Sequence, residues 1–205
     1  MPLEKVAPGS VLELESEPGG RVVVNGTNCT LRVGKNVRLD AAVLIYKEAA
    51  NAVIEIGDDC VIDGIIRIVR GDGGVIRIGA QTTFNQVGVS MHEAGTITFG
   101  RDCMLSTDIH MDVSDMHPIF DRSTGERLNP AQDITLGDHV WLSTRVLVLK
   151  GARIGSGTIV GAGSMVSGAL PQNVLAVGSP ARVVRENVVW TRTMDGQPDL
   201  HPPPA

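Results

Sequence analysis

The chain reads LGDHVWLSTRVLVLKGARIGSGTIVGAGSMV from residue 136 to residue 166. An aliphatic residue returns at every sixth position of this stretch, at Leu136, Leu142, Val148, Ile154, Val160 and Val166. Four residues after these positions the side chain is small or β-branched, at Val140, Val146, Ala152, Thr158 and Ser164. Neither the 3.6-residue period of a helix nor the alternation of a simple strand produces a repeat of six. The stretch therefore predicts a repeat architecture.

A six-residue repeat fits a chain that winds as a triangular prism, with one short strand on each face and a turn at each corner. The aliphatic residue of each hexapeptide points to the axis, and three hexapeptides close one coil of about 18 residues. We expect the glycines beside the aliphatic positions to supply the backbone torsions of the corners. The pattern predicts an all-β fold, a left-handed parallel β-helix, which is an exception to the right-handed crossover preference.

The same pattern occurs earlier in the chain, at Val33-Gly34, Ile56-Gly57, Ile78-Gly79 and Phe99-Gly100. These positions are 23, 22 and 21 residues apart, so we expect longer and looser corners there. Cys60 and Cys103 each follow an aliphatic or aromatic position by four residues, which predicts small, buried core side chains.

One interruption is predicted. The repeat at Met111 should continue near residue 117, but the next good repeat begins at Leu136. Residues from about 112 to 135 therefore form an inserted loop, and long loops in compact domains are usually functional or disordered. We divide the chain into an N-terminal cap or edge segment (1–30), the β-helix (31–181) and a C-terminal arm or short helix with a disordered tail (182–205).

Composition agrees with a single folded domain. The chain has 205 residues, of which 42% are hydrophobic and 20% charged, and its aromatic content of 3% suits a narrow interior. The N-terminus lacks the apolar region of a signal peptide, and no apolar run reaches the roughly 18 residues of a membrane span. Three cysteines without metal-type spacing (Cys29, Cys60 and Cys103) favour a reducing, cytoplasmic location.

The charge is uneven. A net charge of −5 argues against general nucleic-acid binding, yet residues 136–192 carry six basic and two acidic residues, which leaves −9 for the rest. The basic residues of this segment are Arg145, Lys150, Arg153, Arg182, Arg185 and Arg192. Chance scatter over a solvated surface and an anionic ligand at the C-terminal end are both compatible with this pattern.

Several phrases resemble the hexapeptide-repeat acetyltransferase family, over roughly residues 50–192. They are His139–Leu142 with Val148–Gly155, then Ile159–Val166, and Val177–Arg182, where Ser179 replaces the family's usual Asn. The loop phrase Ser114–Asp121 is most similar to the branch that O-acetylates polysaccharides such as polysialic acid.

The resemblance implies acetyl transfer from acetyl-CoA to a sugar hydroxyl of a polysaccharide or other glycan, at clefts between neighbours in a homotrimer. It implies that His117 is the catalytic base and that Trp141 lies beside the thioester. His139 is a competing base. An exposed loop histidine without a role, and a tryptophan that only anchors the trimer interface, are the plainer alternatives.

Histidine suits the reaction, because a base with a pKa near neutrality can take the hydroxyl proton during attack. The imidazolium can then protonate the leaving thiolate, so no covalent enzyme intermediate is needed. Asp112 or Asp115 could hold the other ring nitrogen.

The resemblance also places the cofactor and the acceptor. The residues that it implies along the acetyl-CoA arm are Trp141, Thr144, Ala162, Ser167 and Gly168. Arg182 and Arg185 fall near the phosphates, with Lys150 as a weaker candidate. We expect Asn85 and Asp115 to contact the acceptor, and we expect no metal.

Other functions stay open. The acceptor could be the amine of an amino sugar or another small amine. A zinc-dependent hydratase on the same prism would need three imidazoles, which His92, His110 and His117 could supply, although their spacing does not fit. A β-helix that serves only as a scaffold would need neither the loop histidine nor the basic segment.

Overall fold

The computed structural model describes residues 3–17 and 19–198, and every regular element within this range is a strand. The strands before the loop are β1 (Leu3–Val6), β2 (Val11–Leu14), β3 (Arg21–Val24), β4 (Thr30–Val33), β5 (Arg38–Ala50), β6 (Val53–Ile56), β7 (Val61–Asp72), β8 (Val75–Ile78), β9 (Thr83–Met91), β10 (Thr96–Phe99), β11 (Met104–Leu105) and β12 (Ile109–Asp112). Those after it are β13 (Ile134–Leu136), β14 (Trp141–Leu142), β15 (Leu147–Val148), β16 (Arg153–Ile154), β17 (Ile159–Val160), β18 (Met165–Val166), β19 (Ala169–Leu170), β20 (Val174–Gly178) and β21 (Ala181–Glu186). Within the described range no helix is long and apolar enough to cross a membrane.

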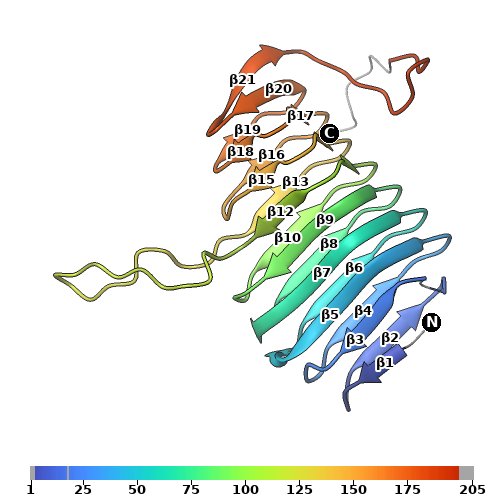
Figure 1. Cartoon of the computed structure of the whole chain (residues 1–205), viewed down its shortest axis with the longest axis vertical. Coiled ribbons are helices and arrows are strands. Elements are labelled where there is room, and N and C mark those ends of the chain that lie inside the picture. The colour runs from blue at the N-terminus through green and yellow to red at the C-terminus, as the bar shows by residue number, and fades with distance from the viewer. Residues whose placement is uncertain (1–2, 18, 199–205) are drawn as a thin grey trace.

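The strands stack as the coils of a parallel β-helix, from β1 at one end to β20 and β21 at the other (Figure 1). Trp141 pairs with Ile159 and Leu147 pairs with Met165, in each case eighteen residues further along the chain. Thr135 likewise pairs with Arg153. The predicted repeat of three hexapeptides per coil is therefore confirmed.

Each coil has three faces. The first face contains β11, β14, β17 and β20, the second contains β12, β15 and β18, and the third contains β10, β13, β16 and β19. We call the turn from the first to the second face corner 1, from the second to the third corner 2, and from the third to the next first face corner 3. These names locate the candidate site residues below.

The core is the axis of the prism. All six aliphatic residues of the repeat between 136 and 166 are at most 2% exposed, and the small residues four positions later are at most 1% exposed. Cys60 and Cys103 are fully buried, as predicted, and so is Cys29. Burial of this kind contributes roughly 25 cal/mol for each Å² of apolar surface, so the repeated aliphatic column supplies the main stabilisation of the fold.

The earlier coils differ from the expectation of longer corners. Strands β5 and β7 run for 13 and 12 residues, whereas β14, β15, β17 and β18 on the same faces have two each. Strand β9 pairs with β11 on the first face and with β12 on the second, so a single strand crosses corner 1. Much of the additional length therefore lies in continuous strands.

The glycines beside the core positions have a different role from the one expected. A Cβ atom on Gly100 would lie 2.5 Å from the backbone nitrogen of Asp138, and one on Gly137 would lie 2.7 Å from that of Ser156. Close approach of the next coil therefore excludes a side chain. The left-handed torsions of corner 3 occur two residues later, at Asp102 (φ 55°) and His139 (φ 54°).

The two ends of the prism are also defined. Strands β1 and β2 lie at the edges of the two sheets, so the first residues of the described chain form the terminal coil. At the other end β21 pairs antiparallel with β20, which makes the segment after residue 181 an extended arm. The alternative of a capping helix is wrong, because β21 pairs with β20 along its whole length, from Ala181 to Glu186. The predicted disorder of the last residues falls mainly on 199–205, outside the described residues.

Candidate active site

The inserted loop leaves the prism at corner 2, between β12 and β13, and projects far from the coils (Figure 1). The predicted interruption at 112–135 is confirmed to within a residue or two, since β12 ends at Asp112 and β13 begins at Ile134. His117 lies near the start of this loop and is exposed. No hydrogen bond of its imidazole occurs among the described residues, so the ring is available to an external group.

The backbone around His117 is held by Asn129, which is only 8% exposed. The Asn129 Nδ2 donates to Asp115 Oδ2 at 2.8 Å and to the carbonyl oxygen of His117 at 2.9 Å. The amide N–H of Ile119 donates to Asn129 Oδ1 at 2.6 Å. The side chain of Asn129 thus joins the outgoing and the returning segment of the loop beside His117.

Lys150 lies at corner 2 of the next coil, after β15, and its side chain reaches the same cluster. Its Nζ donates to Asp115 Oδ2 at 2.6 Å and to the carbonyl oxygen of Pro130 at 3.2 Å. The Lys150 ammonium, together with Asn129, lowers the pKa of Asp115. The structure therefore brings together two residues that the sequence assigned to different ligands, Lys150 to the cofactor and Asp115 to the acceptor.

A second ion pair holds the base of the loop. Arg127 donates two hydrogen bonds to the Glu93 carboxylate, at 2.8 and 2.6 Å, and the hydroxyl of Ser114 donates to the same carboxylate. The Arg127 guanidinium and the Ser114 hydroxyl lower the pKa of Glu93 to about 2. Bidentate pairs of this kind fix orientation as well as charge, so the loop leaves the prism in a defined direction.

The remaining described histidines are engaged with carboxylates. His92 Nδ1 contacts Asp112 Oδ2, and both side chains are largely buried. His110 Nε2 lies 3.2 Å from Asp108 Oδ1. Neither Asp112 nor Asp115 binds the His117 ring, contrary to the expectation that one of them orients it. Within the described chain no group of three or more His, Cys, Asp or Glu residues could hold a metal ion.

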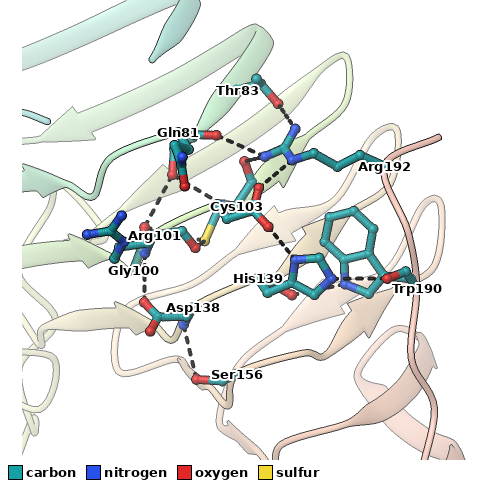
Figure 2. Close-up of polar contacts among 12 residues, drawn as sticks. Gln81, Thr83, Gly100, Arg101, Cys103, Asp138, His139, Ser156, Trp190 and Arg192 are labelled. Atoms are coloured by element: carbon teal, nitrogen blue, oxygen red, sulfur yellow. Dashed lines mark hydrogen bonds and ion pairs between the residues drawn. The ribbon is translucent and has the colours of Figure 1, made fainter. Parts of the chain in front are cut away.

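His139 belongs to a second cluster of contacts, at corner 3, which Figure 2 shows. Its Nδ1 lies 2.6 Å from Asp102 Oδ2, and its Nε2 lies 3.1 Å from the carbonyl oxygen of Trp190. The Trp190 ring stacks on the imidazole with centroids 3.9 Å apart, and its Nε1 donates to the His139 carbonyl at 2.9 Å. Both ring nitrogens of His139 are therefore occupied, which argues against its role as the base.

The same contacts attach the C-terminal segment to corner 3. Arg192 binds the Asp102 carboxylate and donates to the hydroxyl of Thr83 and to the carbonyl oxygens of Gln81 and Cys103, at 2.9–3.1 Å (Figure 2). We call residues 187–198 the C-terminal strap. Through Arg192 the strap contacts Gln81, Thr83 and Cys103, which belong to coils much earlier in the sequence.

Trp141 points outward from the first face, as predicted, and the strap partly covers it. The Trp141 and Trp190 rings are tilted by 47° with centroids 5.8 Å apart. The Nε1 of Trp141 is buried, and it has no hydrogen-bond partner in the part of the chain that the structure describes. A buried donor without a partner is costly, so a ligand carbonyl at this position would stabilise the site.

The other predicted cofactor residues lie in three places: corner 1, corner 2 and strand β21. Thr144 and Ala162 are neighbours at corner 1, where the Gly163 N–H donates to the Thr144 carbonyl at 2.9 Å, and Asn85 is exposed two coils earlier at the same corner. Ser167 and Gly168 are exposed at corner 2, beside Lys150. Arg182 and Arg185 are exposed on β21.

One chain does not bring His117 and Trp141 together. Trp141 lies on the first face, whereas the loop leaves corner 2, which is opposite that face in a three-sided coil. Figure 1 shows the loop on one side of the stack and the C-terminal segment on the other. The two residues that the resemblance assigns to catalysis therefore project from opposite sides of the chain.

Sequence reasoning missed Asn129 and the strap residues Trp190 and Arg192. The strap carried a signal, since one of only two tryptophans follows the last repeat by many residues. The left-handed position of His139 also carried one, because Asn36, Asp59, Gln81, Asp102 and Asn173 occupy the equivalent place in other coils. Asn, Asp and His tolerate this conformation, so a corner role for His139 could have been inferred.

The chain resembles several curated proteins, although no family model matches it. The polysialic acid O-acetyltransferase of Neisseria meningitidis is 33% identical over 175 residues, which are 85% of this chain and 80% of that protein. The enzyme of the same name from Escherichia coli O1:K1 is 32% identical over 126 residues, or 62% of this chain and 41% of that protein. The galactoside O-acetyltransferase of Escherichia coli K12 is 36% identical over 93 residues, 44% of each chain.

Two solved structures share the fold. The polysialic acid O-acetyltransferase OatWY has a TM-score of 0.81 at 30% identity, covering 92% of this chain and 87% of that one. The polySia-specific acetyltransferase NeuO has a TM-score of 0.61 at 28% identity, covering 92% and 81%. The left-handed β-helix fold and the resemblance to polysialic acid O-acetyltransferases are thereby confirmed. The chain belongs to the hexapeptide-repeat acetyltransferase family and is an enzyme that transfers acetyl groups.

Proposed function

We propose that the protein transfers an acetyl group from acetyl-CoA to a hydroxyl group of a glycan, with His117 as the general base. The observation that carries this proposal is the state of the histidines. His139 has both ring nitrogens occupied and His92 is largely buried against Asp112, whereas the His117 imidazole is exposed and has no partner among the described residues. A histidine that accepts a substrate proton needs a free ring nitrogen, and its backbone must be held in place so that this nitrogen can reach the substrate.

The proton balance is simple. Neutral His117 accepts the hydroxyl proton as the oxygen attacks the thioester carbonyl carbon, and the imidazolium then returns a proton to the departing thiolate. The carbon–sulfur bond breaks and a carbon–oxygen ester bond forms, so no covalent enzyme intermediate is required. The buried Nε1–H of Trp141 can donate to a carbonyl of the acyl-pantetheine arm, which would satisfy it.

The residues present fit acetyl-CoA at the C-terminal end of the prism. Small residues at corner 1, Thr144 and Ala162, permit close approach of a slender chain to the backbone. Lys150 and Arg192 already form ion pairs, with Asp115 and Asp102, so Arg182 and Arg185 are the better candidates for the phosphate groups. Replacing both arginines by Ala should raise the KM for acetyl-CoA several-fold and leave kcat nearly unchanged.

A site assembled from two subunits explains the opposite positions of His117 and Trp141. In a homotrimer, the loop of one protomer would lie beside the first face of its neighbour. Light scattering should give a mass three times the 21.7 kDa of the chain. Mixed assembly of the inactive variants His117→Ala and Trp141→Ala should recover part of the activity. If no mixture recovers any activity, each site is contained in one chain.

An assay of thiol release from acetyl-CoA, run with a panel of candidate acceptors, identifies the acceptor. The panel contains polysialic acid, neutral galactosides, amino sugars and a control without acceptor. The names of the relatives favour turnover with the first two, and the acetylated product should carry an ester that mild base removes. Turnover with the amino sugars alone would favour N-acetylation, while no acetyl-CoA binding by calorimetry would favour a scaffold.

A further inference from the structure

The side chain of Asn129 holds the segment of the loop that carries His117. Its amide makes three hydrogen bonds, to Asp115, to the His117 carbonyl and from the Ile119 N–H, and these partners are alternate residues of the segment that carries His117. The Arg127 Nη2 donates to the Asn129 carbonyl oxygen at 3.2 Å, which ties the same residue to the Glu93 ion pair. The side chain of Asn129 is buried although its surroundings project into solvent.

Lys150 completes this arrangement from outside the loop. Asp115 Oδ2 accepts both the Asn129 amide and the Lys150 ammonium, and Lys150 also binds the Pro130 carbonyl next to Asn129. The Lys150 side chain is only 16% exposed, because the loop covers it. A lysine with two fixed oxygen partners and little exposure is poorly placed to bind a mobile phosphate group.

Apolar packing does little to fix the outer part of the loop. Ile119, Phe120 and Leu128 are all more than half exposed, so apolar burial contributes little to the position of the segment. Backbone contacts hold part of residues 115–119, since the Leu128 N–H donates to the Ile119 carbonyl at 2.8 Å and the Met116 N–H donates to the Ser114 hydroxyl at 2.9 Å. The side chains that join this segment to residues outside it are those of Asn129, Asp115 and Lys150. We call these three residues the loop clamp.

We propose that Asn129 is a positioning residue for His117, and that Lys150 acts in the same clamp and not on the cofactor phosphates. The inference rests on the proposed function, in which His117 is the base. The imidazole must reach the acceptor hydroxyl to within hydrogen-bond distance, and a displacement of about 1 Å can cost about 10²-fold in rate. Asn129 sets this distance through the backbone and touches neither substrate.

The test compares three variants by steady-state kinetics. Asn129→Ala removes all three hydrogen bonds, whereas Asn129→Asp keeps an acceptor for the Ile119 N–H and loses only the two donated bonds. Both should lower kcat by about 10-fold or more, with the KM for acetyl-CoA within twofold of wild type. Ser123→Ala, which removes a hydroxyl that binds Asp121 at the loop tip, is the matched control and should keep wild-type kinetics.

Hydrogen exchange supplies a readout that does not depend on activity. The Ile119 amide should lose protection in Asn129→Ala and keep most of it in Asn129→Asp, because only the second variant retains the acceptor. Lys150→Met should lower kcat and raise exchange over residues 115–119, without raising the KM for acetyl-CoA.

The outcomes separate the two proposals. Wild-type protein that turns over no acceptor overturns the proposed function. Active wild type with an Asn129→Ala variant of unchanged kcat overturns the positioning role, and so does a loss that lies entirely in the KM. A Lys150→Met variant whose KM for acetyl-CoA rises at constant kcat returns Lys150 to the cofactor site.

Discussion

The coils after residue 134 and the loop before it are neighbours in sequence but are built on opposite principles. The coils bury one aliphatic residue in every six together with the small residue four positions later, and most of the intervening residues are half-buried. The loop exposes its large apolar residues and is held by Asn129, Lys150 and the Glu93–Arg127 pair. The buried core of the repeat thus stabilises the fold, whereas a small set of polar contacts positions the candidate base.

Truncation of a core residue should give the largest effect on stability. Leu142 is fully buried on the first face, and Leu142→Ala should lower the free energy of unfolding by about 2–5 kcal/mol. Denaturant titration measures this change. Phe120→Ala on the exposed part of the loop is the control and should change stability by less than about 0.5 kcal/mol. Equal losses for both would contradict the division between coil and loop.

The strap should show an intermediate effect. Trp190→Ala removes a ring that is 6% exposed and stacked on His139, so the strap should detach and unfolding should become easier by about 1 kcal/mol. Trp141 is then the only tryptophan, and its emission should shift to longer wavelength. Trp190→Phe keeps a ring and should retain most of the stability. An unchanged Trp141 environment in Trp190→Ala would show that the strap does not cover it.

The smallest effect is expected from acid. The pKa of Glu93 is lowered from 4.5 to about 2 by the Arg127 and Ser114 contacts, so the contribution of this ion pair to stability is complete above pH 4.5 and is lost as the pH falls toward 2. Hydrogen exchange over the loop, corrected for its intrinsic pH dependence, should rise in that range while the coils stay protected. Glu93→Gln should show raised exchange at neutral pH. If hydrogen exchange over the loop rises instead between pH 7 and pH 6, the pH dependence comes from a histidine and not from Glu93.

The same contrast explains what the sequence could predict. Core positions such as Val148 and Ile154 repeat with a fixed period, so a local pattern identifies the fold, the coil length and the gap that the loop fills. The loop has no period. The contact of Lys150 with Asp115 joins residues 35 positions apart, and that of Trp190 with His139 joins residues 51 positions apart, so neither follows from spacing.

Residue type leaves a choice open where one side chain suits two partners. On sequence alone, Lys150 is a weaker candidate for the cofactor phosphates and Asp115 is expected at the acceptor. In the folded chain they bind each other, and only the three-dimensional structure shows that pairing. The extended arm after residue 181 was one of two predicted forms, since the sequence Ala181–Glu186 is compatible with a strand or a short helix.

The central claim is that His117 is the base that activates a glycan hydroxyl for attack on acetyl-CoA. The measurement is kcat of His117→Ala against a glycan that wild type acetylates, with calorimetric binding of acetyl-CoA measured on the same sample. His110→Ala, which removes an exposed imidazole from β12, is the control and should keep wild-type kcat. The account predicts a loss of about 10² or more in kcat with unchanged acetyl-CoA affinity. A His117→Ala variant that retains wild-type kcat would contradict it.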